Sequence, residues 1–469
     1  MLRFAPSPTG DMHIGNLRAA IFNFILARQS GKKFLIRIED TDTARNIEGK
    51  DKEILSLLNL FGLMWDNLVY QSDNFTRHRQ LAEHLIAKGK AFYCYCSKEF
   101  LESKREEAKL SKKPFRYDEA WAELEKGSNP KPVVRLKGAR KAVSFVDSIK
   151  GELCFEAHEL DSFVILKDDG IPTYNFACAV DDMLYDVSFI VRGEDHVSNT
   201  PRQILIHRAL GYEKVLGYAH LPIILGENGS KMSKRDSASS VAWLLEEGFL
   251  PQAILNYLIS MGNRAPCEVF RLDDSLKWFD IKHIAKSPVK FDIKRLRFLN
   301  REHLKQLNEQ DFALLLESKD SSIGALGKLH LQEASTLNEI RAKIESILSP
   351  KDPAMSEGGE SYEAEVRTLY AILREMIDSH ALELESYESL KGALMQKSAL
   401  KGKRFFKPLR ILLSGQTHGL ELSEMYPYLR FFLRDIVRLK DSAPNADSKQ
   451  SRDSKQGAES ARGASEQKE

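Results

Sequence analysis

The chain has 469 residues, of which 42% are hydrophobic, and its 69 Lys and Arg nearly balance its 67 Asp and Glu. Domains usually span about 100–200 residues, so this length predicts roughly three or four structural units and excludes a single small module. A net charge of +2 argues against a protein that is held to nucleic acid by bulk charge alone.

Targeting and redox signals are sparse in the sequence. No run of about 20 uninterrupted apolar residues occurs, and the first residues lack the basic and apolar regions of a signal peptide. We therefore expect a cytoplasmic protein with no membrane contact. The five cysteines, an odd and thinly spread set, favour a reducing compartment over a disulfide framework.

The first forty residues alternate strand and helix signals. A short apolar start at 2–4 precedes a loop rich in Pro and Gly. Apolar side chains then recur with helical spacing between residues 17 and 25, and Gly31 ends that segment. The run 34–38 predicts a buried strand, so the order is that of a parallel α/β unit.

The remaining chain predicts an interrupted α/β fold followed by helices. Short strands with turns are expected at 133–136, 143–146, 153–156 and 163–167. Parallel α/β signals resume with a strand at 188–191, a helix at 201–210 and a strand at 221–225. The pattern is then almost wholly helical from 239 to 440, with a break near 350–359. From residue 441 onward no Val, Ile, Leu, Met or aromatic residue occurs, which predicts a disordered tail.

The N-terminal loop is a candidate phosphate-binding site. It leads from a strand into a helix, whose first N–H groups and dipole favour anions. Gly15 lets a ligand approach the main chain, and His13 can donate to phosphate oxygens. The alternative reading is a simple helix cap. The loop residues are Ala5, Pro6, Ser7, Pro8, Thr9, Gly10, Asp11, Met12, His13, Ile14, Gly15 and Asn16.

A second loop, directly after a predicted strand, carries three cations in five residues. Lysine supplies compact positive charges that stabilise a leaving pyrophosphate, so we interpret the loop as a mobile clamp over polyphosphate. A basic surface loop is the alternative. The residues are Lys231, Met232, Ser233, Lys234 and Arg235.

These two motifs together resemble the signatures of class I aminoacyl-tRNA synthetases. The surrounding segments 3–10, 35–42, 172–177 and 192–201 look like bacterial glutamyl-tRNA synthetase, over about residues 1–440. Pro408-Leu409-Arg410 and Thr417-His418-Gly419 resemble that family's anticodon-binding domain.

The resemblance implies a class I Rossmann-type catalytic domain with an α+β insertion, followed by an all-α anticodon-binding region. The expected segments are the first Rossmann half at 1–91, an inserted acceptor-binding domain at 92–182, the second Rossmann half at 183–238, a stem-contact helical domain at 239–310, a helical anticodon-binding domain at 311–440 and the tail at 441–469.

The resemblance also implies roles for individual residues. Catalysis is expected from His13, Lys231 and Lys234. ATP binding is expected from Pro6, Ser7, Pro8, Thr9, Gly10, His13, Gly15, Asn16, Lys231, Met232, Ser233, Lys234 and Arg235. Glutamate binding is expected from Arg3, Ala5, Ser7, Glu39, Tyr174, Cys178 and Arg192.

The chemistry of glutamate agrees with the residue types of that pocket. Two carboxylates and one ammonium need two cationic forks and an anion, which Arg3, Arg192 and Glu39 can supply. Which arginine takes which carboxylate stays open. Without the resemblance, buried ion pairs are the alternative, with Arg37 bonded to Glu39 and Arg192 bonded to Glu194.

Two cysteine positions depart from or extend the family pattern. At Cys178 the family commonly has an Asn that helps to hold the amino acid, and a thiol is a poor substitute as a hydrogen-bond partner. This departure suggests a duplicated form of the enzyme. Cys94 and Cys96 resemble half of a zinc site that some members carry, but residues 116–123 offer no further Cys or His. We therefore do not expect a bound zinc ion at this pair, nor a metal held by a dedicated set of protein ligands.

The predicted function is ATP-dependent attachment of L-glutamate to tRNA through a glutamyl-adenylate, a ligase step of protein biosynthesis assisted by Mg²⁺. The substrate is tRNA-Glu, tRNA-Gln or both, and the protein is expected to be a monomer. A form that charges tRNA-Gln would associate transiently with a tRNA-dependent amidotransferase. The segment 404–407, Arg-Phe-Phe-Lys, is one candidate anticodon surface, although its two Phe are expected in the core.

Three alternative functions share part of this sequence pattern. Glutaminyl-tRNA synthetase shares the catalytic half, but its anticodon region is a β-barrel, whereas residues 310–440 are predicted helical. Truncated tRNA-modifying relatives lack an anticodon module. A catalytically silent paralogue that only binds tRNA is disfavoured by the intact His13, Glu39, Lys231 and Lys234.

Overall fold

The structure, a computed structural model, describes residues 1–125, 130–232 and 237–440. It divides into two compact units, of which the first is Met1–Leu304 and the second begins at Lys305. The predicted disordered tail lies outside the described residues, as do Ser233, Lys234 and Arg235 of the second predicted motif. None of the helices in the described ranges is long and apolar enough to cross a membrane.

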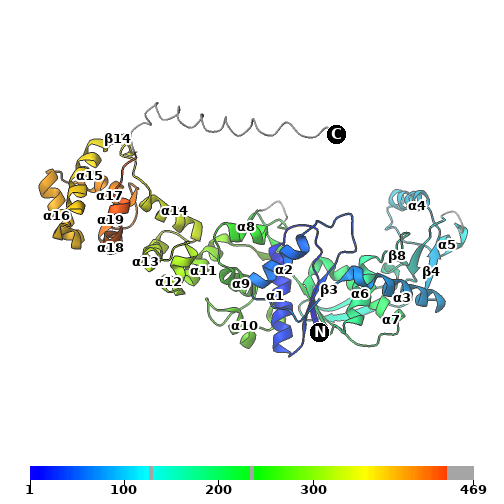
Figure 1. Cartoon of the computed structure of the whole chain (residues 1–469). Coiled ribbons are helices and arrows are strands. Elements are labelled where there is room, and N and C mark those ends of the chain that lie inside the picture. The colour runs from blue at the N-terminus through cyan, green and yellow to red at the C-terminus, as the bar shows by residue number, and fades with distance from the viewer. Residues whose placement is uncertain (126–129, 233–236, 441–469) are drawn as a thin grey trace, which may run out of the picture. The chain divides into compact units, whose positions relative to one another are not determined.

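A seven-stranded sheet forms the centre of the first unit (Figure 1). Its strand order is β3-β2-β1-β9-β10-β6-β7, and every neighbouring pair is parallel except β6 with β7. The residues of β1 and β2 are all buried, as expected for parallel strands that are covered on both faces. The strands are β1 (Leu2–Phe4), β2 (Phe34–Ile38), β3 (Asn67–Tyr70), β6 (Val143–Asp147), β7 (Gly151–Phe155), β9 (Phe189–Gly193) and β10 (Gly217–Leu221).

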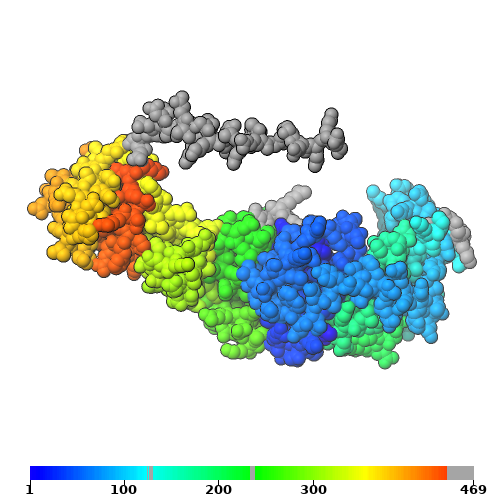
Figure 2. All heavy atoms as spheres, viewed as in Figure 1, coloured from blue at the N-terminus to red at the C-terminus, as the bar shows by residue number. Residues whose placement is uncertain are grey.

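Helix α1 is buried on most of its surface because it lies between the sheet and other helices. It packs against β1 and β9 and against α9 and α10. One hydrophobic core therefore joins the nucleotide fold to the helices after residue 240, and the space-filling view shows the green segment packed against the blue one (Figure 2). The helices of the first unit are α1 (Ile14–Gln29), α2 (Lys50–Leu60), α3 (Phe75–Ala87), α4 (Lys98–Leu110), α5 (Ala120–Leu124), α6 (Tyr174–Leu184), α7 (Thr200–Ala209), α8 (Val241–Glu246), α9 (Pro251–Ser260), α10 (Leu272–Trp278) and α11 (Ile293–Gln306), whose last two residues belong to the second unit.

The inserted segment contains its own small antiparallel sheet, but part of the predicted insertion belongs elsewhere. The small sheet has the order β4-β5-β8, formed by Ala91–Cys94, Val133–Leu136 and Phe163–Leu166. By contrast, β6 and β7, which the sequence analysis placed in the insertion, extend the main sheet. The ring of Phe145 packs edge-on against Tyr218 of β10 at 5.2 Å between centroids, and this contact is not visible in the local pattern.

The predicted strand at 221–225 is also divided in the structure. β10 ends at Leu221, and a two-residue strand, β11 (Ile224–Leu225), pairs instead with β12 (Val289–Lys290). Pro222 has no N–H to donate, which explains the interruption of an otherwise apolar run. The strand signal of β10 was missed because Gly217, Ala219 and His220 have weak strand propensity, although the last four residues of this strand are buried.

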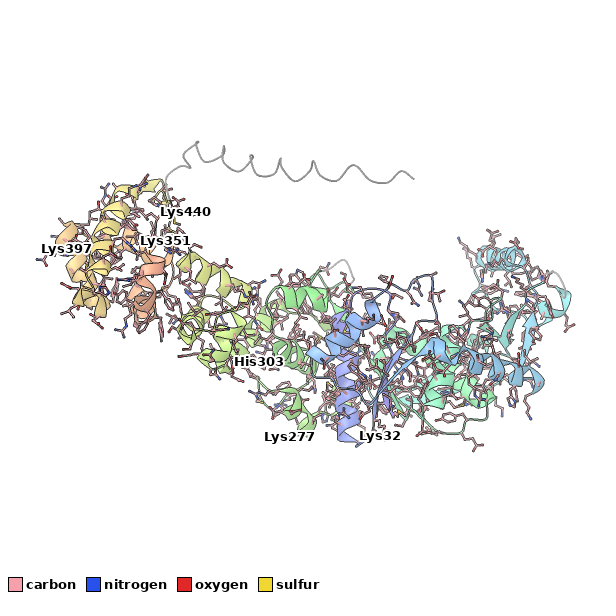
Figure 3. The ribbon with its side chains drawn as sticks, in the orientation of Figure 1. Lys32, Lys277, His303, Lys351, Lys397 and Lys440 are labelled. Atoms are coloured by element: carbon pink, nitrogen blue, oxygen red, sulfur yellow. The ribbon has the colours of Figure 1, made fainter. Side chains whose placement is uncertain are left out.

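The second unit is helical, as predicted. Its break at 350–359 contains part of a short hairpin, β13 (Ser356–Glu357) and β14 (Glu360–Ser361). Just before it, the buried ammonium of Lys351, labelled in Figure 3, donates to the carbonyl groups of Ser346, Ile347 and Ser349 at the end of α14. The helices are α12 (Glu309–Leu315), α13 (Ser321–Leu329), α14 (Leu337–Leu348), α15 (Glu363–Asp378), α16 (Tyr387–Ser398), α17 (Lys403–Ser414), α18 (Leu422–Leu429) and α19 (Leu433–Ile436).

Candidate active site

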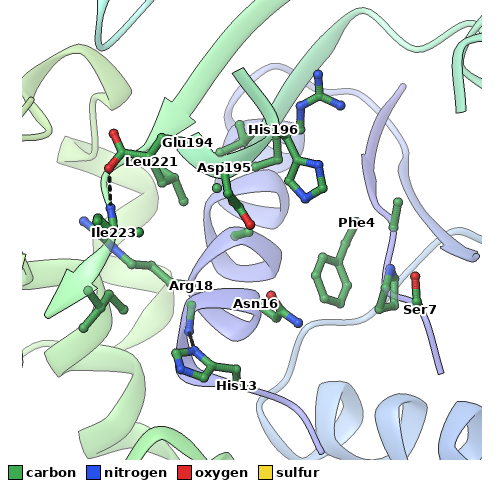
Figure 4. Close-up of a pocket in the computed structure, with 18 of the residues that line it drawn as sticks. Phe4, Ser7, His13, Asn16, Arg18, Glu194, Asp195, His196, Leu221 and Ile223 are labelled. Atoms are coloured by element: carbon green, nitrogen blue, oxygen red, sulfur yellow. Dashed lines mark hydrogen bonds between the residues drawn. The ribbon is translucent and has the colours of Figure 1, made fainter. Parts of the chain in front are cut away.

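A pocket of about 390 Å³ lies where β1, β9 and β10 end and α1 begins (Figure 4). Ligands of open α/β sheets bind at this carboxyl edge of the strands. Among the residues predicted for the site, those that line the pocket are Arg3, Ala5, Pro6, Ser7, Thr9, His13, Gly15, Asn16, Glu39, Tyr174, Arg192, Lys231 and Met232. The structure therefore brings seven residues of the first motif, two of the second and six of the seven predicted glutamate residues to one cavity.

Three predicted residues have described positions but are not among the residues that line this pocket. Pro8 and Gly10 belong to the N-terminal loop but do not reach the cavity. Cys178 is fully buried on α6, behind the pocket. The roles of Ser233, Lys234 and Arg235 remain predictions because these residues are outside the described ranges.

The N-terminus of α1 has the features of an anion-binding site. His13 caps the helix, and its Nδ1 accepts a hydrogen bond from the N–H of Gly15 at 3.0 Å. In the neutral ring the proton therefore lies on Nε2, which can donate. A Cβ at position 15 would lie 3.3 Å from His13 Nδ1, so glycine allows the ring to fold over the helix end. The positive end of a sixteen-residue helix favours phosphate here.

A network of buried charges supports the floor of the pocket. Asp182 Oδ1 accepts from Arg3 Nε at 3.1 Å and from Arg37 Nη1 at 2.6 Å. Arg37 Nη2 also donates to Glu39 Oε1 at 3.0 Å, which is one of the two ion pairs considered from the sequence. Burial by itself would raise the pKa of Asp182, but the two guanidinium groups outweigh it and hold that pKa well below its usual range.

Cys178 belongs to this network. Its Sγ accepts from Arg37 Nη2 at 3.2 Å and lies 3.8 Å from Asp182 Oδ2. Burial raises the pKa of the thiol to about 12, so it is neutral. The thiol thus contacts the charges beneath the site.

Arg192 has different partners from those of the alternative considered from the sequence. Instead of Glu194, it contacts His220 and Thr200. Glu194 pairs with Lys150, and its Oε1 accepts from the N–H of Ile223 at 3.0 Å, the dashed bond of Figure 4.

The pocket also contains residues that the sequence analysis did not select. They are Phe4, Arg18, Ala19, Val191, Gly193, Glu194, Asp195, His196, Leu221, Pro222, Ile223 and Ile224. Arg18 is 1% exposed and donates to the carbonyl of Met261 at 2.6 Å. Its signal was available, because it is a charged residue on the otherwise apolar face of a predicted helix. His196, whose Nδ1 lies 3.1 Å from the Tyr174 hydroxyl, has its pKa lowered to about 4 by burial and by Arg192.

Cys94 and Cys96 lie in the insertion, where their thiols contact other protein side chains. The Tyr117 hydroxyl donates to Cys94 Sγ at 3.1 Å and lies 3.7 Å from Cys96 Sγ. The Arg135 guanidinium stacks on the Tyr117 ring at 3.8 Å. Across the described ranges no group of three or more His, Cys, Asp or Glu could hold a metal ion.

The second unit has a pocket of about 430 Å³, which we call the C-terminal basic pocket. Lysines, an arginine and two aromatic rings face it. Phe405 is fully buried as predicted, but Phe406 is 44% exposed, because it lies at the mouth of this pocket rather than in the core. The lining residues are Tyr387, Lys391, Lys403, Phe406, Lys407, Arg410, Thr417, His418, Gly419, Glu421 and Leu422.

Comparison with known proteins covers both units. Residues 1–298 match the family described as tRNA synthetases class I (E and Q), catalytic domain, and residues 299–429 match an anticodon binding domain. The chain is 80% identical over 439 residues to glutamate–tRNA ligase 2 of Helicobacter hepaticus, which covers 94% of this chain and 100% of the relative. It is 65% identical over 441 residues to glutamate–tRNA ligase 2 of Wolinella succinogenes, with the same two coverages.

The fold also matches a solved structure. The crystal structure of a glutamate tRNA ligase from Elizabethkingia meningosepticum, in complex with its amino acid, has a TM-score of 0.76 at 23% identity. The match covers 93% of this chain and 98% of that one.

Proposed function

The chain belongs to the glutamate–tRNA ligase family of class I tRNA synthetases, and from this membership we propose that it joins L-glutamate to the 3′ end of tRNA in an ATP-dependent reaction. The observation that carries the proposal is the single pocket that combines a helix N-terminus, a lysine of the second motif and buried arginines. These groups suit a nucleoside triphosphate and a dicarboxylic amino acid.

In the first step a carboxylate oxygen of glutamate attacks the α-phosphorus of ATP, the bond to the bridging oxygen breaks, and pyrophosphate leaves. The protein forms no covalent bond and acts by positioning and charge neutralisation. We assign the ATP phosphates to His13 and the start of α1, and the leaving pyrophosphate to Lys231 and Lys234. Of the other residues predicted to bind ATP, those that line the pocket are Pro6, Ser7, Thr9, Gly15, Asn16 and Met232.

Glutamate is assigned to the other side of the pocket. Arg3 and Arg192 would bind its carboxylates, Glu39 its ammonium, and Tyr174 would donate from its hydroxyl. Ala5 and Ser7 would contact it through the loop. Cys178, predicted to bind glutamate, would instead support the buried charges through its hydrogen bond with Arg37.

Mg²⁺ would supply additional charge neutralisation on the phosphates. Mg²⁺ is commonly held by substrate phosphates and water with only one or two carboxylates, so a closed protein site is not required. Three carboxylates line the described part of the pocket, and two of them, Glu39 and Glu194, are paired with cations. Asp195 is therefore the carboxylate that we propose as a ligand of Mg²⁺.

In the second step a ribose hydroxyl of the terminal adenosine of tRNA attacks the glutamyl-adenylate and releases AMP. We place the anticodon loop at the C-terminal basic pocket, since aromatic rings and cations together bind unstacked bases and their phosphates. Because ATP and tRNA are cytoplasmic substrates, the protein is proposed to act in the cytoplasm, as a monomer.

The tRNA specificity has two candidates, tRNA-Glu and tRNA-Gln. The relatives from H. hepaticus and W. succinogenes are both named glutamate–tRNA ligase 2, which favours a duplicated enzyme. A duplicated enzyme also fits the departure at Cys178. An enzyme that charges tRNA-Gln would deliver its product to a tRNA-dependent amidotransferase.

The test is charging of purified tRNA-Glu and tRNA-Gln transcripts with [¹⁴C]glutamate, run separately. Charging of tRNA-Glu alone identifies a discriminating enzyme, and charging of tRNA-Gln, alone or in addition, identifies a misacylating one. Charging of neither would refute the proposal and support the silent paralogue.

The catalytic roles are tested by ATP–pyrophosphate exchange with tRNA present. Lys231→Ala and Lys234→Ala should each lower exchange by about 100-fold, in line with the loss of one transition-state cation. Lys397→Ala, which removes an exposed lysine of the second unit, is the control. Wild-type exchange in both motif variants would contradict the assignment.

A further inference from the structure

One edge of the Arg192 guanidinium is fixed by two buried neighbours. Arg192 is 7% exposed, its Nε donates to His220 Nε2 at 3.2 Å, and its Nη2 donates to Thr200 Oγ1 at 2.7 Å. Nη1 is buried and has no hydrogen-bond partner in the part of the chain that the structure describes. The anchored edge therefore leaves Nη1 as the donor for a ligand in the pocket that Arg192 lines.

This geometry determines where the proton of His220 lies. The N–H of Arg192 Nε can only donate, so His220 Nε2 must accept. The proton is then on Nδ1, which donates to Asp147 Oδ2 at 2.7 Å. In the opposite tautomer, or in a protonated ring, two N–H groups would face each other across 3.2 Å and push the guanidinium away.

Asp147 is held in one position by the backbone around it. It is 1% exposed, and its Oδ2 also accepts from the N–H of His220 at 3.0 Å. Its Oδ1 accepts from the N–H groups of Ile149 and Lys150 at 2.9 and 2.8 Å. Burial raises its pKa, but these bonds and His220 outweigh that effect and lower it, so the carboxylate is charged.

We propose that His220 and Asp147 are positioning residues for glutamate recognition. Asp147 keeps the proton on His220 Nδ1, and His220 Nε2 then holds Arg192 with Nη1 toward a carboxylate of the amino acid. The inference rests on the proposed function, in which Arg192 binds glutamate. It also gives a role to β6, the strand that the structure adds to the main sheet beside β10.

Two substitutions at one position separate this role from simple packing. His220→Asn keeps a donor near Nδ1 but removes the acceptor that faces Arg192, whereas His220→Gln keeps an acceptor near Nε2. In tRNA charging, His220→Asn should raise KM for glutamate about tenfold or more, with little change in kcat or in KM for ATP. His220→Gln should restore most of the loss. Asp147→Asn should give a smaller change of the same kind.

Arg192→Lys makes the two hypotheses distinguishable. If it leaves KM for glutamate unchanged, the proposed role of Arg192 fails. If it raises KM while His220→Asn does not, the role of His220 is overturned and that of Arg192 stands. The role of His220 is also overturned if His220→Asn and His220→Gln raise KM for glutamate equally, or if KM for ATP rises in parallel. Should His220→Asn not fold, Asp147→Asn removes the carboxylate that keeps the proton on His220 Nδ1 and should raise KM for glutamate alone, whereas an unchanged KM would refute the proposal.

Discussion

The candidate active-site pocket and the C-terminal basic pocket hold their charges in opposite ways. Beneath the candidate active-site pocket, Arg3 and Arg37 both pair with Asp182, and all three side chains are at most 3% exposed. In the C-terminal basic pocket Lys403 is 58% exposed and Phe406 is 44% exposed. A small ligand of fixed shape is recognised by charges that are desolvated and oriented beforehand, whereas a flexible polyanion needs only accessible charges and stacking surfaces.

The largest expected effect is on stability, from substitution of the buried Asp182. Asp182→Asn removes the carboxylate that two buried guanidinium groups share, which leaves Arg3 without this counter-charge and Arg37 with that of Glu39. We expect the free energy of unfolding to fall by about 3–5 kcal/mol, measured by urea denaturation at neutral pH. The same substitution at Asp186, which is 73% exposed, is the control and should change stability by less than about 1 kcal/mol.

The pH dependence of this difference follows from the direction of the pKa shift. The folded-state pKa of Asp182 is lowered, so its stabilisation is complete above the unfolded value of about 4 and is lost as pH falls toward the folded pKa. The difference in free energy of unfolding between wild type and Asp182→Asn should therefore be constant from pH 5 to 8, and it should become smaller below about pH 4. Equal stability of the two proteins at pH 7 would show that the pair is not stabilising.

On the exposed side, the largest effect is expected from the aromatic ring at the mouth of the C-terminal basic pocket. Phe406→Ala removes a surface on which an unstacked base can lie, and such stacking contributes about 1–3 kcal/mol. The dissociation constant of the cognate tRNA should rise roughly tenfold, measured by filter binding, while ATP binding stays unchanged. Phe431→Ala, which truncates a ring that is 65% exposed outside this pocket, is the control. Equal losses in both variants would contradict a specific role for Phe406.

The sequence predicted the residues that line the candidate pocket better than the network that supports them. Residues such as His13, Glu39 and Arg192 could be predicted because they lie in short motifs next to strand ends. The contacts of Asp182 with Arg3 and Arg37, and of Asp147 with His220, join residues 73 to 179 positions apart, and no local pattern encodes such distances. β6 was assigned to the insertion for the same reason, since pairing with β10 depends on long-range packing of Phe145.

A smaller effect is expected from Cys178, whose substitution should change stability but not the binding of glutamate. Cys178→Ala removes the sulfur that accepts from Arg37 Nη2, which should lower stability by about 1–2 kcal/mol. Because Cys178 does not line the described pocket, KM for glutamate should change by less than about twofold. Thermal unfolding and tRNA charging measure the two quantities on the same sample. A large change in KM without a change in stability would place the thiol in contact with glutamate after all.

The smallest effect is expected from a single exposed cation, and its signature is dependence on salt rather than loss of affinity at one condition. Lys403 lines the C-terminal basic pocket and pairs with Glu360 at 2.6 Å, with both side chains more than half exposed. If it contacts one phosphate of a single-stranded loop, Lys403→Ala should make the slope of log K against log salt shallower by about 0.7. Lys397→Ala, which removes the same charge from another exposed position of this unit, should leave the slope unchanged. An identical slope in wild type and Lys403→Ala would mean that RNA does not reach this rim, and that the accessible charges serve solubility instead of recognition.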